Sequence, residues 1–323
     1  MSLASGHVEA RIVQTAVELG IFDALEASPS SAAAIATSRK LNPRATELLL
    51  NALASLQLLN KQSETFSLAD ISKRHLLLSS PHYLGDMIRF ESSLWPCWEK
   101  LPEAIGSGQP VRSANMYQDD PDETAIFINA MDSLVQARGD AEVVASLLNW
   151  DEVGELLDVG SGPATYPIVL CKKFARLRAT IFDLPATLNL TRGFVREAGL
   201  EDRVRLIAGD YHKDTIPGDY DVIFLSNIIH SEDYAKNESL IRKLTKNLKL
   251  SGRMIVKDHI LDDSRASPAV GAIFSLLMLL TTDGGRCYSF SEIESWMKQS
   301  GLSRVEQINL PFPLTSSLVI GAK

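Results

Sequence analysis

The C-terminal half of the chain alternates short apolar runs with amphipathic segments. Apolar runs predict strands at 155–160, 179–185, 204–211, 220–230 and 252–261. Helical periodicity predicts helices over 163–175, 186–198, 235–249 and 291–299. Strands that alternate with helices indicate a parallel sheet with crossover helices. The final segment, 305–323, predicts two more strands joined by a proline-containing turn, and this pair is expected to be antiparallel because no helix fits between them.

The N-terminal 80 residues follow a different pattern. Helical spacing runs over 8–25 and is interrupted at Gly20, a second helix is expected from Ser31 to Ser38, and a third begins at Asn42-Pro43. Residues 58–70 predict a small hairpin, so this part has the pattern of a winged helix. Such a module binds either DNA or protein, and the Ala/Leu-rich helices favour protein.

Three regions follow from these patterns. We expect a winged-helix domain over 1–80, a helical linker over 81–150 whose long helix at 121–148 is broken at Gly139, and an α/β domain over 151–323. The expected fold class is a doubly wound, Rossmann-like sheet with a C-terminal antiparallel strand pair.

Composition narrows the class of protein. The 323 residues are 45% hydrophobic and 22% charged, which is typical of a soluble globular protein, and the net charge of −8 argues against nucleic acid as a partner. The longest apolar stretch, Ala272–Leu280, is shorter than the roughly 20 residues that span a bilayer, so no membrane partner and a cytoplasmic location are expected. The three scattered cysteines and the lack of clustered ligands predict neither disulfides nor a metal.

Candidate chemistry lies where the predicted strands end, because ligands of doubly wound sheets bind there. Gly160 and Gly162 follow the first strand and permit a tight turn. Asp183 ends the second strand, 25 positions after Asp158, near where an acidic residue accepts hydrogen bonds from ribose hydroxyls. Together they predict a nucleoside-containing ligand, either a dinucleotide or S-adenosylmethionine.

Two features separate these ligands. The dinucleotide fingerprint requires a third glycine where Thr165 stands, whereas G-x-G-x-A, ending at Ala164, is close to the G-x-G-x-G of S-adenosylmethionine enzymes. Asp210 adds an acceptor that suits an adenine amino group. The cofactor predicted from these residues is S-adenosyl-L-methionine.

Segments along nearly the whole chain resemble one family. They are ELGIFDAL, NPRATELLLNALASLQLL, DDPDETAIFINAMDSL, LLDVGSGPATYPIVL, DVIFLSNIIH and DGGRCYSFSEIESWMKQSGL. The chain is similar to the caffeate-type small-molecule O-methyltransferases of plants, fungi and bacteria. The resemblance implies a class I methyltransferase sheet, a winged-helix dimerisation domain that swaps across a homodimer, and methyl transfer to a hydroxyl of a small aromatic or polycyclic metabolite, as in secondary metabolism.

The resemblance also implies roles for residues. His230 would be the general base, with Asp258 beside it in place of a glutamate. The cofactor would be held by Asp158, Gly160, Gly162, Asp183, Leu184, Asp210, Tyr211 and Ser226. The acceptor would be lined by Phe127, Asn129, Met131, Phe274, Met278 and Thr282, although the residues on the helix around Phe274 equally fit ordinary core packing.

Three positions depart from the family pattern. Ser231 stands where phenol-methylating members often have an acidic residue, Cys287 stands in place of a second glutamate, and Ser226 stands in place of a lysine. These departures leave carbon or nitrogen methylation, or a non-methylating use of the cofactor, as alternatives. A winged-helix regulator with a cofactor-sensing domain is the alternative from another class.

Overall fold

The computed structural model describes residues 2–113 and 116–323 and divides into two compact units. The first unit comprises Met1–Trp95 and Asn129–Arg138, and the second comprises Pro96–Ile128 and Gly139–Lys323. The long helix α9 (Pro121–Arg138) contributes to both units and ends before Gly139, which adopts a left-handed conformation with φ of +71°. The predicted break in the 121–148 helix is therefore confirmed, and α10 (Asp140–Leu147) follows it.

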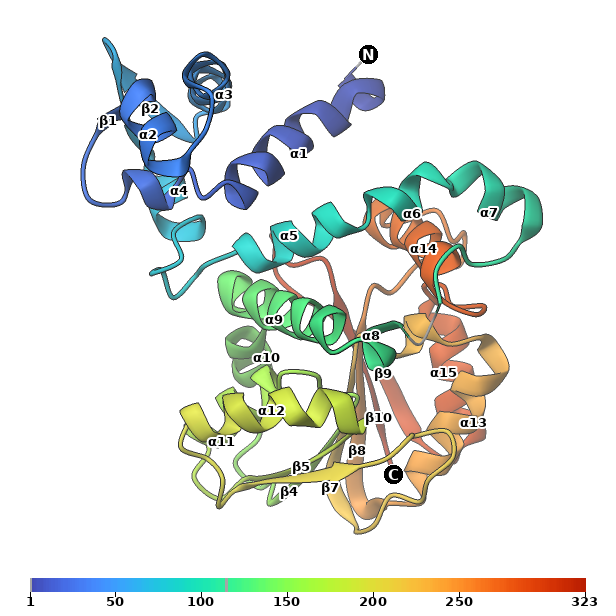
Figure 1. Cartoon of the computed structure of the whole chain (residues 1–323). Helices are drawn as coiled ribbons and strands as arrows, with labels where there is room; N and C mark the ends of the chain where they lie inside the picture. The colour runs from blue at the N-terminus through green and yellow to red at the C-terminus, as the bar shows by residue number, and fades with distance from the viewer. Residues whose placement is uncertain (1, 114–115) are drawn as a thin grey trace. The chain divides into compact units, whose positions relative to one another are not determined.

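The first unit contains the expected winged helix (Figure 1). Its helices are α1 (Ser2–Glu18), α2 (Ala32–Arg39), α3 (Pro43–Ser55), α4 (Asp70–His75) and α5 (Gly85–Ser93). The hairpin of β2 (Leu59–Gln62) and β3 (Thr65–Leu68) is confirmed, and the two-residue strand β1 (Ser30–Ser31) completes a sheet of order β1-β3-β2. Ser31 and Asn42 cap α2 and α3 by accepting hydrogen bonds from backbone N–H groups. Helix α1 begins before the predicted residue 8, and its predicted interruption at Gly20, where φ is +65°, is confirmed.

The second unit is built on a seven-stranded sheet. Its strands are β4 (Glu155–Val159), β5 (Arg178–Asp183), β6 (Val204–Ala208), β7 (Tyr220–Ser226), β8 (Leu248–Asp258), β9 (Ser303–Asn309) and β10 (Ser317–Ala322). Their order is β6-β5-β4-β7-β8-β10-β9, and β10 pairs antiparallel with both β8 and β9. The predicted parallel sheet and antiparallel C-terminal pair are confirmed. The strand order reverses between β4 and β7, which lie side by side.

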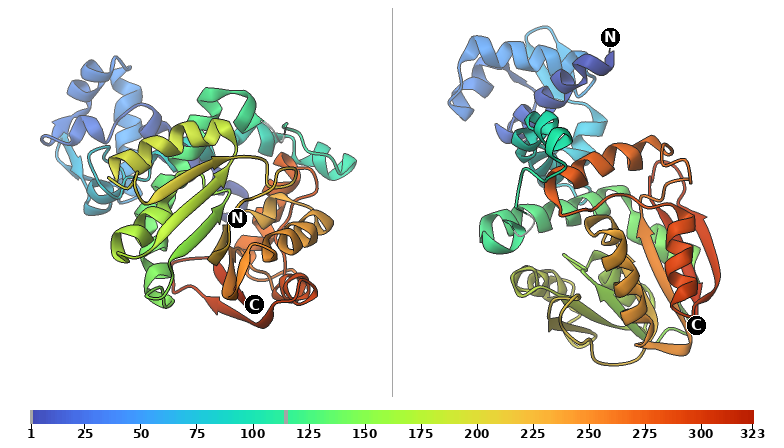
Figure 2. Two further views of the ribbon diagram at one scale, coloured as in Figure 1. Left: turned by 90° about the horizontal axis from the view of Figure 1, so that it is seen from below. Right: turned by 90° about the vertical axis from the view of Figure 1, so that its right-hand side faces the viewer.

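Helices cover both faces of this sheet (Figures 1 and 2). Helices α11 (Thr165–Lys173) and α12 (Pro185–Glu197) lie on one face, and α13 (Tyr234–Thr245) and α15 (Phe290–Gln299) lie on the other. Helix α13 ends before the predicted residue 249, because Leu248 already pairs with Tyr220 as the start of β8. The remaining helices are α6 (Trp95–Glu99), α7 (Leu101–Ser107), α8 (Met116–Asp119) and α14 (Ala269–Thr281).

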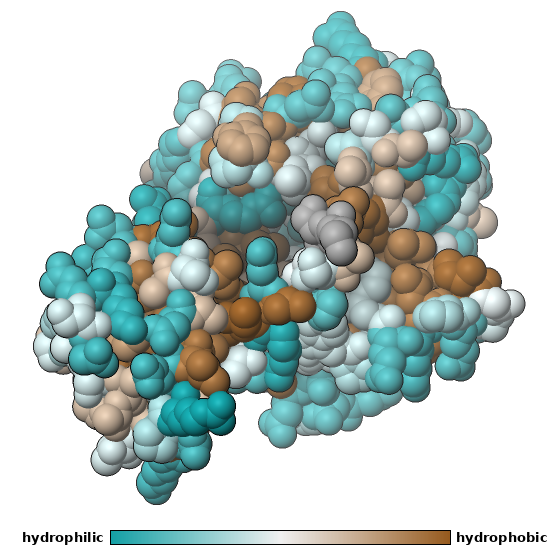
Figure 3. Space-filling view, turned by 90° about the horizontal axis from the view of Figure 1, so that it is seen from above, coloured by the Kyte–Doolittle hydropathy of each residue, from teal (hydrophilic) through white to brown (hydrophobic). Residues whose placement is uncertain are grey.

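The core of the second unit lies between the sheet and the helices of α13 and α15. It includes Leu157, Ile223, Leu225, Val256, Trp296 and Met297, all essentially inaccessible to solvent. The face drawn in Figure 3 is mostly polar with separate apolar clusters. Among the described residues, we find no helix with the length and apolar character needed to cross a membrane.

Candidate active site

The turn after β4 depends on two glycines. Gly160 and Gly162 have φ angles of +67° and +60°, a region that L side chains rarely adopt. A Cβ atom on Gly160 would stand 2.3 Å from Cδ1 of Ile228, which follows β7. The turn after β4 and the segment after β7 are therefore in direct contact at the point where the strand order reverses.

Asp183 fastens this turn to the end of β5. Its carboxylate accepts hydrogen bonds from the backbone N–H of Gly162 at 2.8 Å and of Leu184 at 2.7 Å, and from the side chain of Thr187. Burial raises the pKa of Asp183 to about 6, although these hydrogen bonds oppose the rise. A carboxylate accepts about four hydrogen bonds, so about one position remains for a ligand hydroxyl.

Two buried oxygens at the strand ends lack a protein partner. Asp158 accepts a hydrogen bond from the Ser161 hydroxyl at 2.7 Å through Oδ2, but no described residue hydrogen-bonds its Oδ1. The hydroxyl of Ser226, at the end of β7, is likewise buried and without a partner among the residues that the structure describes. Buried polar groups are normally paired, so both atoms fit a polar ligand at this edge.

Asp210 and Tyr211 follow β6 and are held by their neighbours. Asp210 pairs with Lys213 at 2.8 Å and accepts a hydrogen bond from the N–H of His212. Partial burial raises the pKa of Asp210, but Lys213 and this hydrogen bond outweigh it and lower the pKa overall. The Tyr211 hydroxyl donates to Glu232 at 2.8 Å, and its ring lies 4.0 Å from where a Cβ on Gly160 would stand.

His230 and Asp258 form a buried pair. Nδ1 of His230, in the short helix η2 (Ile229–Ser231), lies 2.8 Å from Oδ1 of Asp258, which also accepts from the N–H of His259. Burial raises the pKa of Asp258, but the two histidines more than compensate and hold it below its usual range. The carboxylate is therefore an acceptor, Nδ1 of His230 carries the proton, and Nε2 is left to accept another.

The turn that carries His230 is packed from two sides. The side-chain amide of Asn237, on α13, donates to the carbonyls of Ile229 and Glu232 at 2.8 and 3.2 Å. On the other side, a Cβ atom on Gly285 would stand 2.4 Å from the carbonyl oxygen of His230. The imidazole is thus held by its backbone as well as by Asp258.

The structure brings part of the expected acceptor set to this pair. The ring of Phe274 meets the His230 ring edge to face, with centroids 4.9 Å apart. Thr282 accepts a hydrogen bond from the N–H of Gly285 at 3.0 Å. A Cβ atom added to Gly285 would touch both the Thr282 hydroxyl and the His230 carbonyl, so these two groups lie close together. Met278 is buried on α14, the helix that also carries Phe274.

The other expected acceptor residues lie on α9. Phe127 precedes Ile128, whose Cδ1 would be 3.6 Å from a Cβ on Gly162. Asn129 and Met131 belong to the first unit, and their role stays a prediction. Cys287 is a buried thiol whose pKa is raised to about 12, first by burial and then by the charge of Asp258. It supplies no second carboxylate.

Sequence reasoning missed two threonines of this site, Thr187 and Thr191 on α12. Thr191 donates to the carbonyl of Gly162 at 2.6 Å, and Thr187 contacts Asp183. Both occupy the same face as the apolar Leu188 and Val195. Hydroxyls on a buried helical face are the signal that could have identified them.

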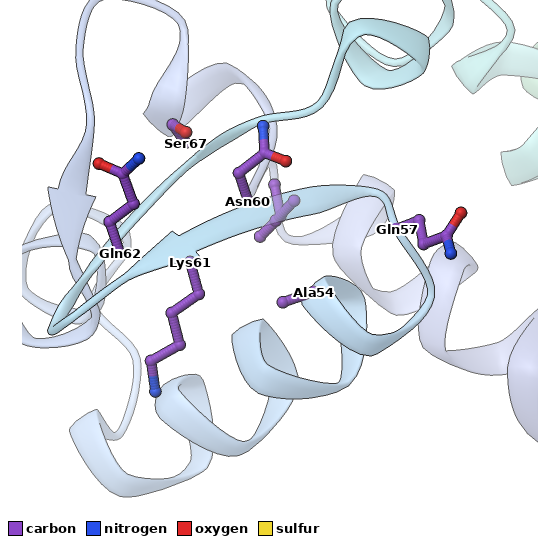
Figure 4. A pocket seen from close by; sticks show the side chains of 7 residues that line it. Ala54, Gln57, Asn60, Lys61, Gln62 and Ser67 are labelled. Carbon is purple, nitrogen blue, oxygen red and sulfur yellow. The ribbon is translucent and has the colours of Figure 1, made fainter.

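A separate cavity of about 570 Å³ lies in the first unit, beside the hairpin (Figure 4). Its lining residues are Ala54, Gln57, Leu59, Asn60, Lys61, Gln62 and Ser67. Its polar groups are the amides of Gln57, Asn60 and Gln62, the Lys61 ammonium and the Ser67 hydroxyl, and none of the predicted site residues lies among them. Within residues 2–113 and 116–323, no three His, Cys, Asp or Glu side chains gather as a metal site would require.

Comparison with protein families decides between the expected classes. An O-methyltransferase domain matches residues 82–303, and an O-methyltransferase dimerisation domain matches residues 1–77. The chain belongs to the O-methyltransferase family. It is an S-adenosylmethionine-dependent enzyme, and the predicted family, fold class and cofactor are confirmed. The alternatives of a nitrogen or carbon methyltransferase and of a winged-helix regulator are not favoured.

Individual relatives agree with this assignment. The tetracenomycin polyketide synthesis 8-O-methyl transferase TcmO of Streptomyces glaucescens is 30% identical, over 100% of this chain and 96% of the relative. A 3-hydroxy-5-methyl-1-naphthoate 3-O-methyltransferase of Streptomyces sahachiroi is 26% identical over 99% of this chain and 94% of the relative. Human N-acetylserotonin methyltransferase, solved with S-adenosylmethionine, is similar in fold: its TM-score is 0.88 at 21% identity, with 100% of this chain and 96% of that chain covered.

Proposed function

We propose that this O-methyltransferase methylates a phenolic hydroxyl of a small aromatic or polycyclic metabolite, with His230 as general base. The observation that carries the proposal is the buried His230–Asp258 pair, which directly follows the segment in contact with the glycine turn. Relatives support the acceptor class, because TcmO is named for tetracenomycin polyketide synthesis and another relative for a naphthoate.

The cofactor residues fit the chemistry of the donor. S-adenosylmethionine supplies an electrophilic methyl group on a sulfonium sulfur. Asp183 would accept a hydrogen bond from a ribose hydroxyl at its remaining lone pair. The oxygens of Asp158 and Ser226 that have no partner among the described residues offer further polar contacts. Gly160 and Gly162 let the backbone approach closely, while Leu184, Asp210 and Tyr211 complete the proposed pocket.

His230 performs the proton transfer in this proposal. A phenol has a pKa of about 10 and an ordinary imidazole of about 6.5, so the hydroxyl needs an adjacent base as its oxygen becomes nucleophilic. Nε2 accepts that proton, and ionised Asp258 stabilises the resulting imidazolium through Nδ1. Burial of the pair keeps competing water away and strengthens the interaction.

The acceptor would lie against Phe274, Met278 and Thr282 of α14 and its end, with Phe127, Asn129 and Met131 from α9. Apolar and adaptable side chains suit a flat aromatic ring. The dimerisation domain supports a homodimer, and we propose that residues 1–80 form the pairing surface between two copies. A single-copy mass in solution would contradict that assembly.

Methyl transfer from labelled S-adenosylmethionine to a panel of phenols, naphthols and hydroxyanthraquinones tests the function. With any acceptor found, His230→Ala should lower kcat roughly 100-fold or more, because general base catalysis contributes about that much. Affinity for S-adenosylhomocysteine should stay within about twofold, since the side-chain hydrogen bond of His230 is made with Asp258 and not with a cofactor residue. Asp151→Ala, at an exposed position outside residues 1–80, is the control. Unchanged turnover of His230→Ala would remove the general-base role.

A further inference from the structure

The carbonyl of Gly162 has a partner outside its own turn. The hydroxyl of Thr191, which is completely buried on α12, donates to it at 2.6 Å. The N–H of the same glycine donates to Asp183 at 2.8 Å. Both backbone polar groups of Gly162 are therefore fixed, in a residue whose φ of +60° has many alternatives in a free chain.

A second threonine, one helical turn earlier, supports the carboxylate. Nε2 of Gln118, on α8, donates to the hydroxyl oxygen of Thr187 at 3.1 Å. Because Gln118 is the donor in that contact, the single proton of Thr187 is available to the carboxylate of Asp183, whose pKa the Thr187 hydroxyl lowers.

Ordinary buried threonines in this chain behave differently. Thr245 on α13 and Thr281 on α14 bond only the carbonyl four residues earlier in their own helix, at 2.8 Å each, as helical threonines commonly do. Thr191 also lies 3.0 Å from such a carbonyl, that of Thr187, but its shorter contact is with the glycine turn. Its hydroxyl thus links a helix to a ligand-binding turn.

We propose that Thr187 and Thr191 are positioning residues for the cofactor, and that Gln118 extends this network to α8. Thr191 holds the Gly162 side of the site and Thr187 holds the Asp183 side, so both halves are set before the ligand arrives. A preorganised site loses less conformational freedom on binding and binds more tightly. This inference rests on the proposed function in that it takes S-adenosylmethionine as the ligand held by the turn.

Thr191→Val tests the proposal, because valine keeps the shape of threonine and removes the hydroxyl. Calorimetric titration with S-adenosylhomocysteine should show a Kd raised roughly fivefold to tenfold, as expected for one lost hydrogen bond. The KM for S-adenosylmethionine should rise equally, whereas kcat and the acceptor KM should not change. Thr191→Ser should restore the parent values.

Thr245→Val is the matched control, since it removes a buried helical hydroxyl that has no contact with the turn. It should leave the Kd unchanged even if both variants unfold at lower temperature. Should Thr191→Val fail to fold, Gln118→Ala provides an independent test at a half-buried position, with an expected twofold to fivefold rise in Kd.

The outcomes separate the inference from the function. If the parent binds S-adenosylhomocysteine and Thr191→Val binds it equally well, the positioning role is overturned and the methyltransferase assignment stands. The same follows if Thr191→Val does not fold and Gln118→Ala leaves the Kd unaltered. If the parent itself does not bind S-adenosylhomocysteine, the proposed function fails together with the inference.

Discussion

Three aspartates of the site occupy similar strand ends, but their surroundings shift their pKa values differently. Burial raises the pKa of Asp158 to about 8, with the Ser161 hydroxyl opposing and the charge of Asp183 adding to the rise. The pKa of Asp183 rises only to about 6, because more hydrogen bonds stabilise its carboxylate. Burial raises the pKa of Asp258, but the two histidines beside it hold that pKa below its usual range. The environment, rather than the residue type, sets each role.

The raised pKa of Asp158 predicts a dependence of stability on pH. Between pH about 4 and about 8 the folded protein keeps a proton that the unfolded chain has lost, so the free energy of unfolding should fall as pH rises through this window. Above pH about 6, where Asp183 loses its proton, Asp158 should contribute a fall of up to about 1.4 kcal/mol per pH unit.

Urea unfolding of Asp158→Asn at pH 6 to 8 measures this effect at the residue scale. The neutral amide should flatten the slope of unfolding free energy against pH. Asp262→Asn is the control, because the Ser264 hydroxyl lowers the pKa of that exposed carboxyl and it titrates below the window. An equal slope in Asp158→Asn and the parent would show that Asp158 is ionised in the folded protein.

Residue positions were predictable where they follow strand ends. Asp183 and His230 could be identified because a carboxyl end of a strand is visible in the pattern of apolar runs. The buried helical face of Thr191 could be recognised from the sequence, but its contact with Gly162 could not, because that contact joins residues 29 positions apart and depends on how α12 packs.

The short helix η2 is the element that presents the imidazole. It is only three residues long, and Asn237 on α13 donates to the carbonyl of its first residue, Ile229, and to that of Glu232, which follows it. Its geometry therefore depends on a neighbouring helix as well as on its own backbone hydrogen bonds.

Asn237→Leu should disturb this element alone. Loss of the amide removes one donor from each of two backbone carbonyls, because the N–H of Glu232 still donates to Ile229 and the Tyr288 hydroxyl still donates to Glu232. We expect the two lost hydrogen bonds to lower stability by about 1–3 kcal/mol. The kcat should fall about tenfold or more as His230 shifts, while the Kd for S-adenosylhomocysteine stays within about twofold. Asn189→Leu, exposed on α12, is the control. A kcat equal to that of the parent would show that η2 keeps its geometry without Asn237.

Helices and strands were predictable where the repeat of apolar residues extends over enough positions to be recognised. The strands of the parallel sheet and the helices between them were identified from apolar runs and helical spacing. The end of α13 was misplaced because the amphipathic pattern continues into Leu248, which the sheet recruits. Strand β1 was missed because two residues carry no period and its pairing with β3 is distant in sequence.

At the scale of the whole molecule, the reversal of strand order gathers the site. The ends of β4, β5, β7 and β8 bring Asp158, Asp183, Ser226 and Asp258 to one edge of the sheet. The order of motifs along the chain was enough to predict the family. The identity of the acceptor was not predictable, because residues such as Phe274 and Met278 on α14 fit ordinary core packing as well as contact with an aromatic ring.

The central claim is that this edge binds S-adenosylmethionine through the glycine turn and Asp183. Calorimetric titration with S-adenosylhomocysteine, on the parent and on Asp183→Ala, tests it most directly, with the exposed Asp151→Ala as control. The parent and Asp151→Ala should bind alike, and Asp183→Ala should bind roughly 100-fold more weakly, because hydrogen bonds to a charged group are lost. Equal affinity of Asp183→Ala and the parent would show that Asp183 does not hold the cofactor.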